Sequence, residues 1–450
     1  MATTTTSTTA VVDSRPARTG RWLHDWDPED PAFWESTGRR IARRNLIFSI
    51  FAEHLGFSVW LLWSIVVVRL NSAGFHLSVG QQLALTAVPS GVGAVLRLPY
   101  TFAVPIFGGR NWTVISALLL LVPSLGLAWA VSDPTTSYGV LLAVAATAGL
   151  GGGNFASSMA NISFFYPESE KGWALGLNAA GGNVGVAVVQ KAVPLVVVAG
   201  GGLALARAGL MYVPLAVVAA VLAFLFMDNL HEAKADVGST ARAARRGQTW
   251  LLSVLYIGTF GSFIGYSSAF PTLLSTAFHR RDIALVWGFL GALVGSAARP
   301  IGGRLADRYG GALITVYSFA LMVAGAVGAL LSVQRHDLGL FFGSFLALFA
   351  ATGIGNGSTY RMVPAVFRAM EGTAGNRLAM KREAAGALGI ISAVGAFGGF
   401  LVPLFYAWSV SATGSIQPAL RFYVGMFAAM LVLTWVAYLR PGGRLTGIGA

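Results

Sequence analysis

Apolar residues in this chain gather into twelve long segments that alternate with polar connections. The segments span residues 46–70, 79–107, 112–132, 138–165, 171–200, 208–227, 250–277, 283–306, 311–333, 338–367, 383–409 and 418–438. Each is long enough to cross about 30 Å of hydrocarbon at roughly 1.5 Å per helical residue. The strict alternation of a transmembrane β-barrel strand is missing from them. The pattern therefore predicts an all-α membrane protein with twelve transmembrane helices.

The longest polar stretch between apolar segments divides them into two groups of six. It covers residues 228–249 and separates a predicted bundle at 46–227 from a second at 250–438. Two pseudo-symmetric six-helix halves are typical of secondary transporters, whose halves move against each other. An arbitrary twelve-helix protein, such as a membrane enzyme, is the alternative to a transporter.

Polar tails are predicted at both ends, at residues 1–45 and 439–450. Residues 1–20 lack the apolar core of a signal peptide, and we expect them to be disordered. The next stretch, WLHDWDPEDPAFWES at 22–36, combines aromatic residues, acids and two prolines. We expect it to lie along the membrane face or to cap one end of the protein.

The composition supports a membrane protein and excludes several kinds of functional site. Hydrophobic residues make up 55% of the chain and charged residues only 11%, against about 25% in an ordinary soluble domain. The chain has no cysteine, which excludes disulfides, thiolate metal sites and cysteine nucleophiles. The sequence also shows no metal-ligand cluster, nucleophile–base pair or phosphate-binding loop, so no enzyme, cofactor or metal is predicted.

The basic residues predict the orientation, because lysine and arginine concentrate in cytoplasmic loops. Most of them fall on one side if both termini are cytoplasmic, which accounts for most of the net charge of +13 without a nucleic-acid partner. The residues on that side include Arg15, Arg18, Arg21, Arg39, Arg40, Arg43, Arg44, Lys234, Arg242, Arg245, Arg246, Arg361, Arg368, Arg377, Lys381 and Arg382. The sequence therefore predicts a multi-pass inner-membrane protein, expected to be a monomer in the lipid bilayer.

Two arginines interrupt apolar segments at matching places in the two halves. Arg97 lies in GAVLRLPYTF of the second segment, and Arg299 lies in GSAARPIGGR of the eighth. An ionisable residue at membrane depth costs about 2.5–3.5 kcal/mol to insert, so it is a functional candidate. A single arginine can also extend to the interface or bond to backbone carbonyls. The matched pair favours a shared central site.

Little protein counter-charge is expected around this pair. Asp307 follows Arg299 by more than two turns and is placed in a cytoplasmic loop, and Glu53 is placed near the cytoplasmic third of the first helix. A ligand anion is then the natural partner, and the planar guanidinium fork suits a planar oxyanion such as nitrate. Formate or another carboxylate remains an alternative.

Glycines repeat the correspondence between the halves. The fifth segment contains GLNAAGGNVGVA and the eleventh contains GIISAVGAFGGFLVP, both with small residues four apart that allow close helix packing. The candidate glycines are Gly176, Gly181, Gly182, Gly185, Gly395, Gly398 and Gly399. Asn183 is the polar exception, and a ligand contact and a neighbouring helix are equally good partners for it.

Aromatic residues could complete a site for a flat anion. Phe155 lies in the fourth segment; Tyr256, Phe260 and Phe263 lie in the seventh. Tyr256 and Phe260 are four residues apart and share a helix face. For any single ring, however, a lipid-facing or core position is the commoner role.

Longer runs resemble a known family. GGRLADRYGG at 302–311 resembles the loop motif of the major facilitator superfamily, including Gly303, Asp307 and Arg308, while the copy PIFGGRNW in the first half lacks the aspartate. This motif is either a gating latch between the halves or an ordinary charged turn.

LRLPYTFAVPIFGGRNWT, GGGNFASSMANISFFYP and GLNAAGGNVGVA resemble the nitrate/nitrite porters (NarK type) of that superfamily. The resemblance covers the chain from the first helix onward and implies a major facilitator fold that binds nitrate between Arg97 and Arg299. It implies ring stacking by Phe155 and Phe260 and polar support from Asn183 and Tyr256.

Nitrate/nitrite exchange is the expected mechanism, because two unbalanced positive charges are costly to enclose without an anion. Proton-coupled nitrate uptake is the alternative and needs an embedded titratable group, for which Glu53 and His54 are the candidates. Their position near a helix end favours a solvated role instead. The sequence leaves open whether the nitrate serves respiration or assimilation.

Overall fold

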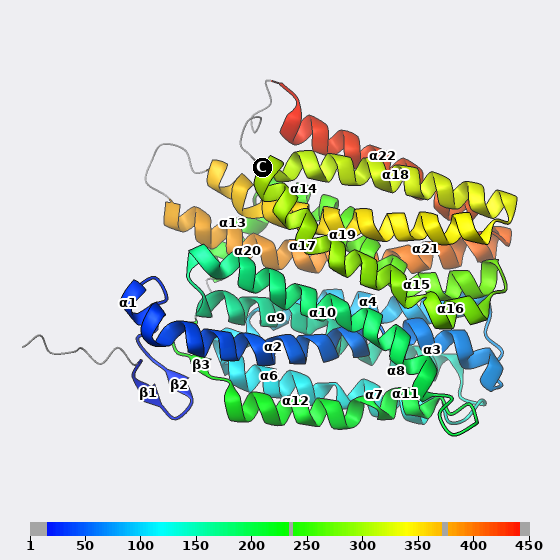
Figure 1. The fold of residues 1–450 in the computed structure, drawn as a ribbon, viewed down its shortest axis with the longest axis horizontal. Coiled ribbons are helices and arrows are strands. Elements are labelled where there is room, and N and C mark those ends of the chain that lie inside the picture. Colours follow the sequence, from blue (N-terminus) through cyan, green and yellow to red (C-terminus); the bar gives the residue numbers. More distant parts are fainter. Residues whose placement is uncertain (1–15, 234–236, 371–376, 442–450) are drawn as a thin grey trace, which may run out of the picture.

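The computed structural model describes residues 16–233, 237–370 and 377–441, and it contains helices long and apolar enough to cross a membrane twelve times. Figure 1 shows them roughly parallel, with the first half of the chain, blue to green, beside the second half, yellow to red. The predicted fold class, twelve helices in two six-helix halves, is confirmed.

The first half contains six spans, several of them broken into consecutive helices. Its elements are α1 (Pro31–Phe33), η1 (Trp34–Gly38), α2 (Arg39–Trp60), α3 (Trp63–Leu70) and η2 (Asn71–Ala73) in span one, α4 (Val79–Thr101) in span two, the short α5 (Ala103–Phe107), α6 (Gly109–Leu119) and α7 (Leu121–Ala130) in span three, α8 (Tyr138–Thr147) and α9 (Gly149–Phe165) in span four, α10 (Glu168–Val196) in span five, and α11 (Ala206–Leu210) and α12 (Tyr212–Phe226) in span six.

The second half repeats this plan. Its elements are α14 (Gly247–Tyr256), the π-helical turn η3 (Ile257–Gly261) and α15 (Ser262–Ala277) in span seven, α16 (Arg281–Trp287) and α17 (Phe289–Tyr309) in span eight, α18 (Gly311–Arg335) in span nine, α19 (Leu338–Ala369) in span ten, α20 (Arg377–Ala396) and α21 (Gly398–Thr413) in span eleven, and α22 (Gln417–Thr434) and η4 (Trp435–Leu439) in span twelve. The short helix α13 (Val237–Ala244) lies between the halves in sequence.

The corresponding turns of the two halves share one backbone conformation. Gly108 precedes α6 with φ 84°, and Gly310 precedes α18 with φ 93°. Side-chain-bearing residues rarely adopt such positive φ values, so glycine is needed at both places. This explains why both copies of the loop motif keep their glycines although only one keeps an aspartate.

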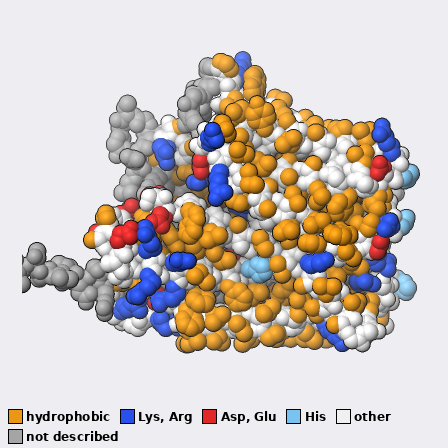
Figure 2. Space-filling model, in the orientation of Figure 1, with side chains coloured by type: hydrophobic (Ala, Val, Ile, Leu, Met, Phe, Trp, Pro, Cys, Tyr) orange, Lys and Arg blue, Asp and Glu red, His pale blue; other side chains and the backbone are white. Residues whose placement is uncertain are grey.

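A wide apolar surface surrounds the bundle. Figure 2 shows hydrophobic side chains over the middle of the visible face, with Lys and Arg gathered towards both ends. Large apolar side chains point outward, including Trp129 at 66%, Leu195 at 62% and Phe224 at 56% exposure. An exposed apolar belt of this extent is expected where lipid replaces water as the solvent.

The segment before the first span is more ordered than predicted. The sequence placed residues 1–20 in a disordered tail, but Arg18–Thr19 form strand β1, which pairs antiparallel with β2 (Trp22–Leu23). Strand β2 pairs in parallel with β3 (Asn229–Leu230), just after span six. Because these partners are far apart in sequence, local composition gave no signal of the pairing. Residues 1–15, including Arg15, lie outside the described residues.

Aromatic packing and a buried ion cluster secure this segment. Trp26 packs edge-on against Phe33 and Phe165, with ring centroids 5.1 and 5.4 Å away. Asp228 is fully buried, pairs with Arg44, and has Arg18 and Arg21 within 4.0 and 3.8 Å. The segment therefore caps the first half, one of its two expected positions. Figure 1 shows this cap at the same end of the bundle as α13.

The first span also begins earlier than the predicted residue 46. It starts at Pro31, and α2 already buries Ile41 and Ala42. Four arginines at 39, 40, 43 and 44 hide this extension in a hydropathy pattern, although the helix continues through them. Of the basic residues predicted to be cytoplasmic, Lys234 lies outside the described residues, and so do the side chains of Arg377 and Lys381.

Candidate functional site

Arg97 is held at the centre of the molecule, where α4 meets both halves. Its side chain is fully buried; Nε donates to the Gly152 carbonyl at 3.2 Å and Nη1 donates to the Ser392 carbonyl at 2.9 Å. Gly152 belongs to α9 of the first half and Ser392 to α20 of the second. The remaining nitrogen, Nη2, is buried without a partner among the described residues.

Arg299, on α17, approaches the same centre from the second half. It is 6% exposed, and its Nη1 is also buried and unpartnered in the described chain. Its Cζ atom lies 5.9 Å from the Phe155 ring centroid, while Arg97 Cζ lies 4.6 Å from the same ring. The structure therefore brings together the two predicted arginines and Phe155, and each arginine keeps a free buried donor.

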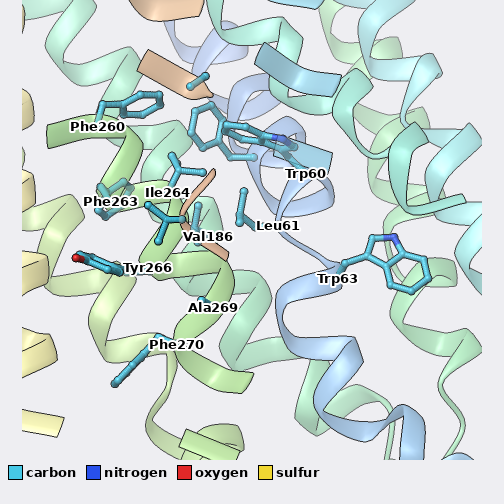
Figure 3. Packing of buried hydrophobic residues seen from close by; sticks show 14 of the residues in the cluster. Trp60, Leu61, Trp63, Val186, Phe260, Phe263, Ile264, Tyr266, Ala269 and Phe270 are labelled. Atoms are coloured by element: carbon cyan, nitrogen blue, oxygen red, sulfur yellow. The ribbon is translucent and has the colours of Figure 1, made fainter. Parts of the chain in front are cut away.

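Aromatic rings from both halves surround the guanidinium groups. Phe155 and Phe260 stack with centroids 6.1 Å apart, and Phe260 stacks on Tyr256 at 5.1 Å. Phe260 lies in η3, and Arg97 Cζ is 5.0 Å from its ring. Figure 3 shows Phe260 at the head of a column with Phe263, Tyr266 and Phe270. A π-helical turn often marks a functional position, because the extra residue redirects side chains.

Polar groups at this centre retain unused hydrogen-bonding capacity. Tyr256 donates its hydroxyl to Asn356 Oδ1 at 2.9 Å, and Asn356 Nδ2 has no partner among the described residues. On α10, both amide atoms of Asn183 are also buried and have no partner among the described residues. Buried polar atoms are normally hydrogen-bonded, so a concentration of free ones marks a place where a polar ligand belongs.

Three residues that contact the two arginines or Tyr256 escaped sequence reasoning. The Trp60 ring lies 5.4 Å from Arg97 Cζ, the Tyr360 ring lies 5.9 Å from Arg299 Cζ, and Asn356 holds Tyr256. A signal for the last two was present: GIGNGSTY in the tenth segment resembles GLGGGNFASS in the fourth. Trp60 is the last residue of α2, and its apolar surroundings in the sequence do not distinguish it from other buried positions.

Glu53 lies in a different environment from the one predicted. The sequence placed it near a solvated helix end, but the residue is only 1% exposed and lies within α2, which begins at Arg39. The prediction failed because the helix extends further than its apolar pattern, which moves Glu53 deep into the span. His54 is half-buried, and its Nδ1 lies 3.1 Å from the Gly181 carbonyl oxygen.

Most of the candidate glycines lie at tight helix contacts. A Cβ on Gly185 would stand 2.3 Å from the His54 carbonyl oxygen, and one on Gly398 would stand 2.5 Å from Gly261 Cα. Gly181, Gly182, Gly395 and Gly399 face side chains at comparably short distances. Gly176 differs, because a Cβ there meets nothing within 4 Å among the described residues. The glycines thus bring α10 against α2, and α20 and α21 against span seven.

The loop motif lies at the end of the bundle that carries α13. Asp307 is in the last turn of α17 rather than in a loop as predicted, because the helix continues to Tyr309. Its carboxylate pairs with Arg361 of α19 at 2.8 Å, within the same half. Arg361 reaches the other half, since its Nη1 lies 2.8 Å from a Cβ built on Gly172. Gly303 has open space beside it, and the Arg308 guanidinium lies over Tyr309.

The opposite end is closed by hydrogen bonds between the halves. Gln190 of α10 donates to the Ser267 carbonyl at 2.7 Å, and Arg281 donates to the Ser72 hydroxyl at 2.6 Å. Arg97 and Arg299 are also nearly inaccessible to water in this structure. Among the described residues, no group of three or more His, Asp or Glu side chains is placed to bind a metal ion.

Two helical bundles around a shared, buried, charged centre define a membrane transporter, and comparison with known proteins agrees. Residues 46–376 match the sequence model described as the Major Facilitator Superfamily, so the chain belongs to that superfamily. Among solved structures, a D-xylose–proton symporter superposes with a TM-score of 0.65 at 16% identity, covering 86% of this chain and 97% of that one. Such a distant likeness supports the fold alone.

Within the superfamily, the chain belongs with the nitrate/nitrite porters, as the resemblance implied. It is 41% identical to the nitrate/nitrite transporter NarU of Salmonella typhimurium, over 93% of this chain and 96% of that protein. It is 35% identical to the probable nitrate/nitrite antiporter NarK2 of Thermus thermophilus, over 94% and 98% of the two chains. These relatives are named as transporters, and this chain is a multi-pass membrane transporter rather than an enzyme.

Proposed function

We propose that this protein exchanges nitrate for nitrite across the inner membrane by alternating access. One observation carries the proposal: among the described residues, Arg97 and Arg299 each keep one buried guanidinium nitrogen without a partner, and both guanidinium groups lie beside the Phe155 ring. An uncompensated charged donor in a low-dielectric interior is costly, and a bound anion supplies the missing partner. The relatives named for nitrate and nitrite indicate which anion that is.

The shape of the site fits a flat anion. Phe155 and Phe260 lie nearly parallel, with 23° between their planes, and guanidinium groups offer parallel donors in one plane. In this proposal the two arginines donate to the anion, the rings limit its thickness and exclude water, and Asn183 and Tyr256 orient it. Nitrate and nitrite are both planar and singly charged, so the same groups serve both.

Exchange follows from the charge of the enclosed site. An occupied centre closes more easily than an empty one, because attraction between an anion and the arginines strengthens as the local dielectric falls. The bundles at 46–227 and 250–438 would then reorient only when loaded, connected by the segment 228–249. The glycine contacts on α10 and α21 give closely packed helices that can slide.

The proposed orientation places both termini, the segment 228–249 and the loop motif in the cytoplasm. Arg242 and Arg246 both pair with the buried Glu383 at 3.0 Å, so this end carries a basic surface held together by ion pairs. That agrees with the tendency of basic residues to remain inside. We propose a monomer as the functional unit, because both arginines of the site come from one chain, and we propose no nucleic-acid partner.

The test is transport by the purified protein in liposomes, followed as uptake of labelled nitrate at fixed pH. One batch contains internal nitrite, a second an inert anion, and a third the inert anion with an imposed pH gradient. We expect uptake only into nitrite-loaded vesicles. Gradient-driven uptake into nitrite-free vesicles would support a proton symporter instead, and absence of any nitrate movement would remove the substrate assignment.

A further inference from the structure

The cap brings arginines that are distant in the sequence to one place beside the end of α12. Arg44 of α2 forms an ion pair with Asp228. Nitrogen atoms of Arg18 and Arg21 lie 4.0 and 3.8 Å from the Oδ1 atom of the same carboxylate. The strand pairing positions these two arginines, because it holds the start of the chain against the residues that follow α12. Their grouping is therefore a product of the fold rather than of a basic run in the sequence.

A fourth arginine places this group at the edge of the apolar belt. Arg110 of α6 donates from Nε to the Phe224 carbonyl at 2.9 Å, and its Cζ atom lies 4.3 Å from the centroid of the Phe224 ring. That residue is 56% exposed on the outward, apolar surface of the bundle. Arg21 donates to the next carbonyl, that of Leu225. Because α12 ends at Phe226, these guanidinium groups lie where the apolar surface of the span stops.

The group carries more positive than negative charge. Among the described residues, Asp228 pairs with three of its arginines, and Arg110 pairs with no carboxylate. Four arginines and one aspartate have a formal charge of plus three. The side chains of Arg18, Arg21 and Arg44 are 42%, 38% and 35% exposed, so part of each guanidinium is open to a ligand. Figure 2 shows Lys and Arg side chains gathered at the capped end, next to the hydrophobic surface.

Charge and position together define the ligand that this surface fits. Arginines beside a lipid-facing surface attract the anionic headgroups of the membrane itself. The guanidinium group also binds phosphate oxygens well, because its parallel donors lie in one plane. An anionic phospholipid fits both parts of the surface: its phosphate meets the arginines while its acyl chains lie along Phe224 and the apolar face of α12. A water-soluble anion would match the charge alone.

We propose that Arg18, Arg21, Arg44 and Arg110 form a binding site for the phosphate of an anionic phospholipid. One headgroup there contacts β1, α2 and α6, which belong to different parts of the first half. The bound lipid therefore fastens the cap to the bundle and stabilises the first half against unfolding. The site is separate from the central pair of arginines, and its occupancy does not require the transported anion.

Titration of the purified, full-length protein in neutral detergent with phosphatidylglycerol tests the proposal. The measured quantity is the lipid concentration that gives half of the maximal rise in melting temperature, since a ligand that binds the folded state raises it. We expect this rise with phosphatidylglycerol and not with phosphatidylcholine or inorganic phosphate at the same concentrations. Each arginine near anionic lipid contributes about fivefold in affinity, so Arg18→Gln should raise the half-maximal concentration about fivefold and Arg18→Gln/Arg110→Gln about 25-fold.

Two further variants make the outcome decisive. Arg335→Gln removes the same charge from an exposed position in the last turn of α18, at the opposite end of the bundle, and should leave the titration unchanged. Arg18→Gln alone decides if the double variant does not fold, because among the described residues the Arg18 side chain makes only the 4.0 Å approach to Asp228.

An equal rise with phosphatidylcholine would overturn the proposal, because no anionic headgroup would then be needed. An equal rise with inorganic phosphate would overturn it too, since the acyl chains would have no part. The proposal also fails if Arg18→Gln titrates as the unmodified protein does, or if Arg335→Gln shifts the titration as far as Arg18→Gln.

Discussion

Arg97 and Arg299 occupy corresponding places in the two halves, yet the protein holds them differently. Arg97 donates two hydrogen bonds to carbonyls, one of them across the boundary to α20, and has three aromatic rings around it. Arg299 faces two rings at 5.9 Å and keeps a slight exposure. The two halves therefore supply matching charges, but the protein restrains them unequally. Hydrogen bonds to backbone carbonyls hold the Arg97 side chain in place, whereas the position of the Arg299 side chain depends more on the ligand.

Replacing either arginine by lysine should have the largest effect and should separate the two roles. Lysine keeps the charge but loses the planar fork. Each hydrogen bond from a charged group is worth about 1.5–3 kcal/mol, so Arg97→Lys should reduce nitrate exchange at least 100-fold. It should also lower the melting temperature of the purified protein, because it loses the bonds to Gly152 and Ser392.

Arg299→Lys should reduce exchange strongly with little change in melting temperature. Nitrate should raise the melting temperature of the unmodified protein but should not raise that of either variant. If the two substitutions lowered the melting temperature equally, the hydrogen bonds of Arg97 to the backbone would not contribute to the stability of the protein.

Alanine at the tightest glycine contacts should have the next largest effect. Gly185→Ala and Gly398→Ala place a methyl group against backbone atoms that cannot turn aside, and overpacking of this kind costs about 1–3 kcal/mol. Both should lower the melting temperature and the exchange rate. The matched controls are Gly176→Ala and Gly389→Ala. Among the described residues, a Cβ at position 176 meets nothing within 4 Å, and a Cβ at position 389 meets only Thr101, at 3.6 Å. If the controls were as harmful, close approach would not explain these glycines.

Removing the Tyr256 hydroxyl should have a moderate effect confined to the second half of the site. Tyr256→Phe keeps the ring stacked on Phe260 but leaves Asn356 Oδ1 without its donor. Loss of such a buried bond costs about 1–3 kcal/mol, so nitrate KM should rise roughly tenfold. Tyr317→Phe, at an exposed position on α18, is the control and should behave as the unmodified protein. An unchanged KM in Tyr256→Phe would remove this hydroxyl from the site.

Asp307→Asn should have the smallest effect on stability. Its partner Arg361 and the aspartate itself are 41% and 51% exposed, and exposed ion pairs contribute about 0–1 kcal/mol. The melting temperature should therefore scarcely change, while the exchange rate falls severalfold if the pair latches one end of the transport cycle. Asp282→Asn, in an exposed pair at the opposite end, is the control. Equal rates for both variants would make the loop motif an ordinary charged turn.

Much of the fold was predictable because lipid imposes a simple requirement. A span must be helical and apolar for about 20 residues, so hydropathy alone located the twelve helices. It did not locate their ends where helices leave the membrane, as with the arginine-rich start of α2. The β2–β3 pairing was also missed, since no local pattern announces a partner some 200 residues away.

The sequence identified site residues whose type is rare in a membrane span, and it missed residues whose type is common there. Arg97 and Arg299 stand out because charges are rare in membrane spans. Trp60 could not be distinguished from other aromatic residues, because its role depends on which helix it faces. Glu53 was noticed but misplaced, because α2 begins well before the apolar pattern does. Whether the predicted residues bind nitrate remains a prediction that the lysine variants address.

The small sheet beside the first half also bears on how the chain is made. Trp22 pairs with Asn229, so the chain emerging first from the ribosome must wait for the whole first bundle before its strand can pair. Asp228 likewise gathers Arg18, Arg21 and Arg44 only at that moment. The cap therefore cannot form before span six has been synthesised. It marks the point in biosynthesis at which the first bundle closes as a unit.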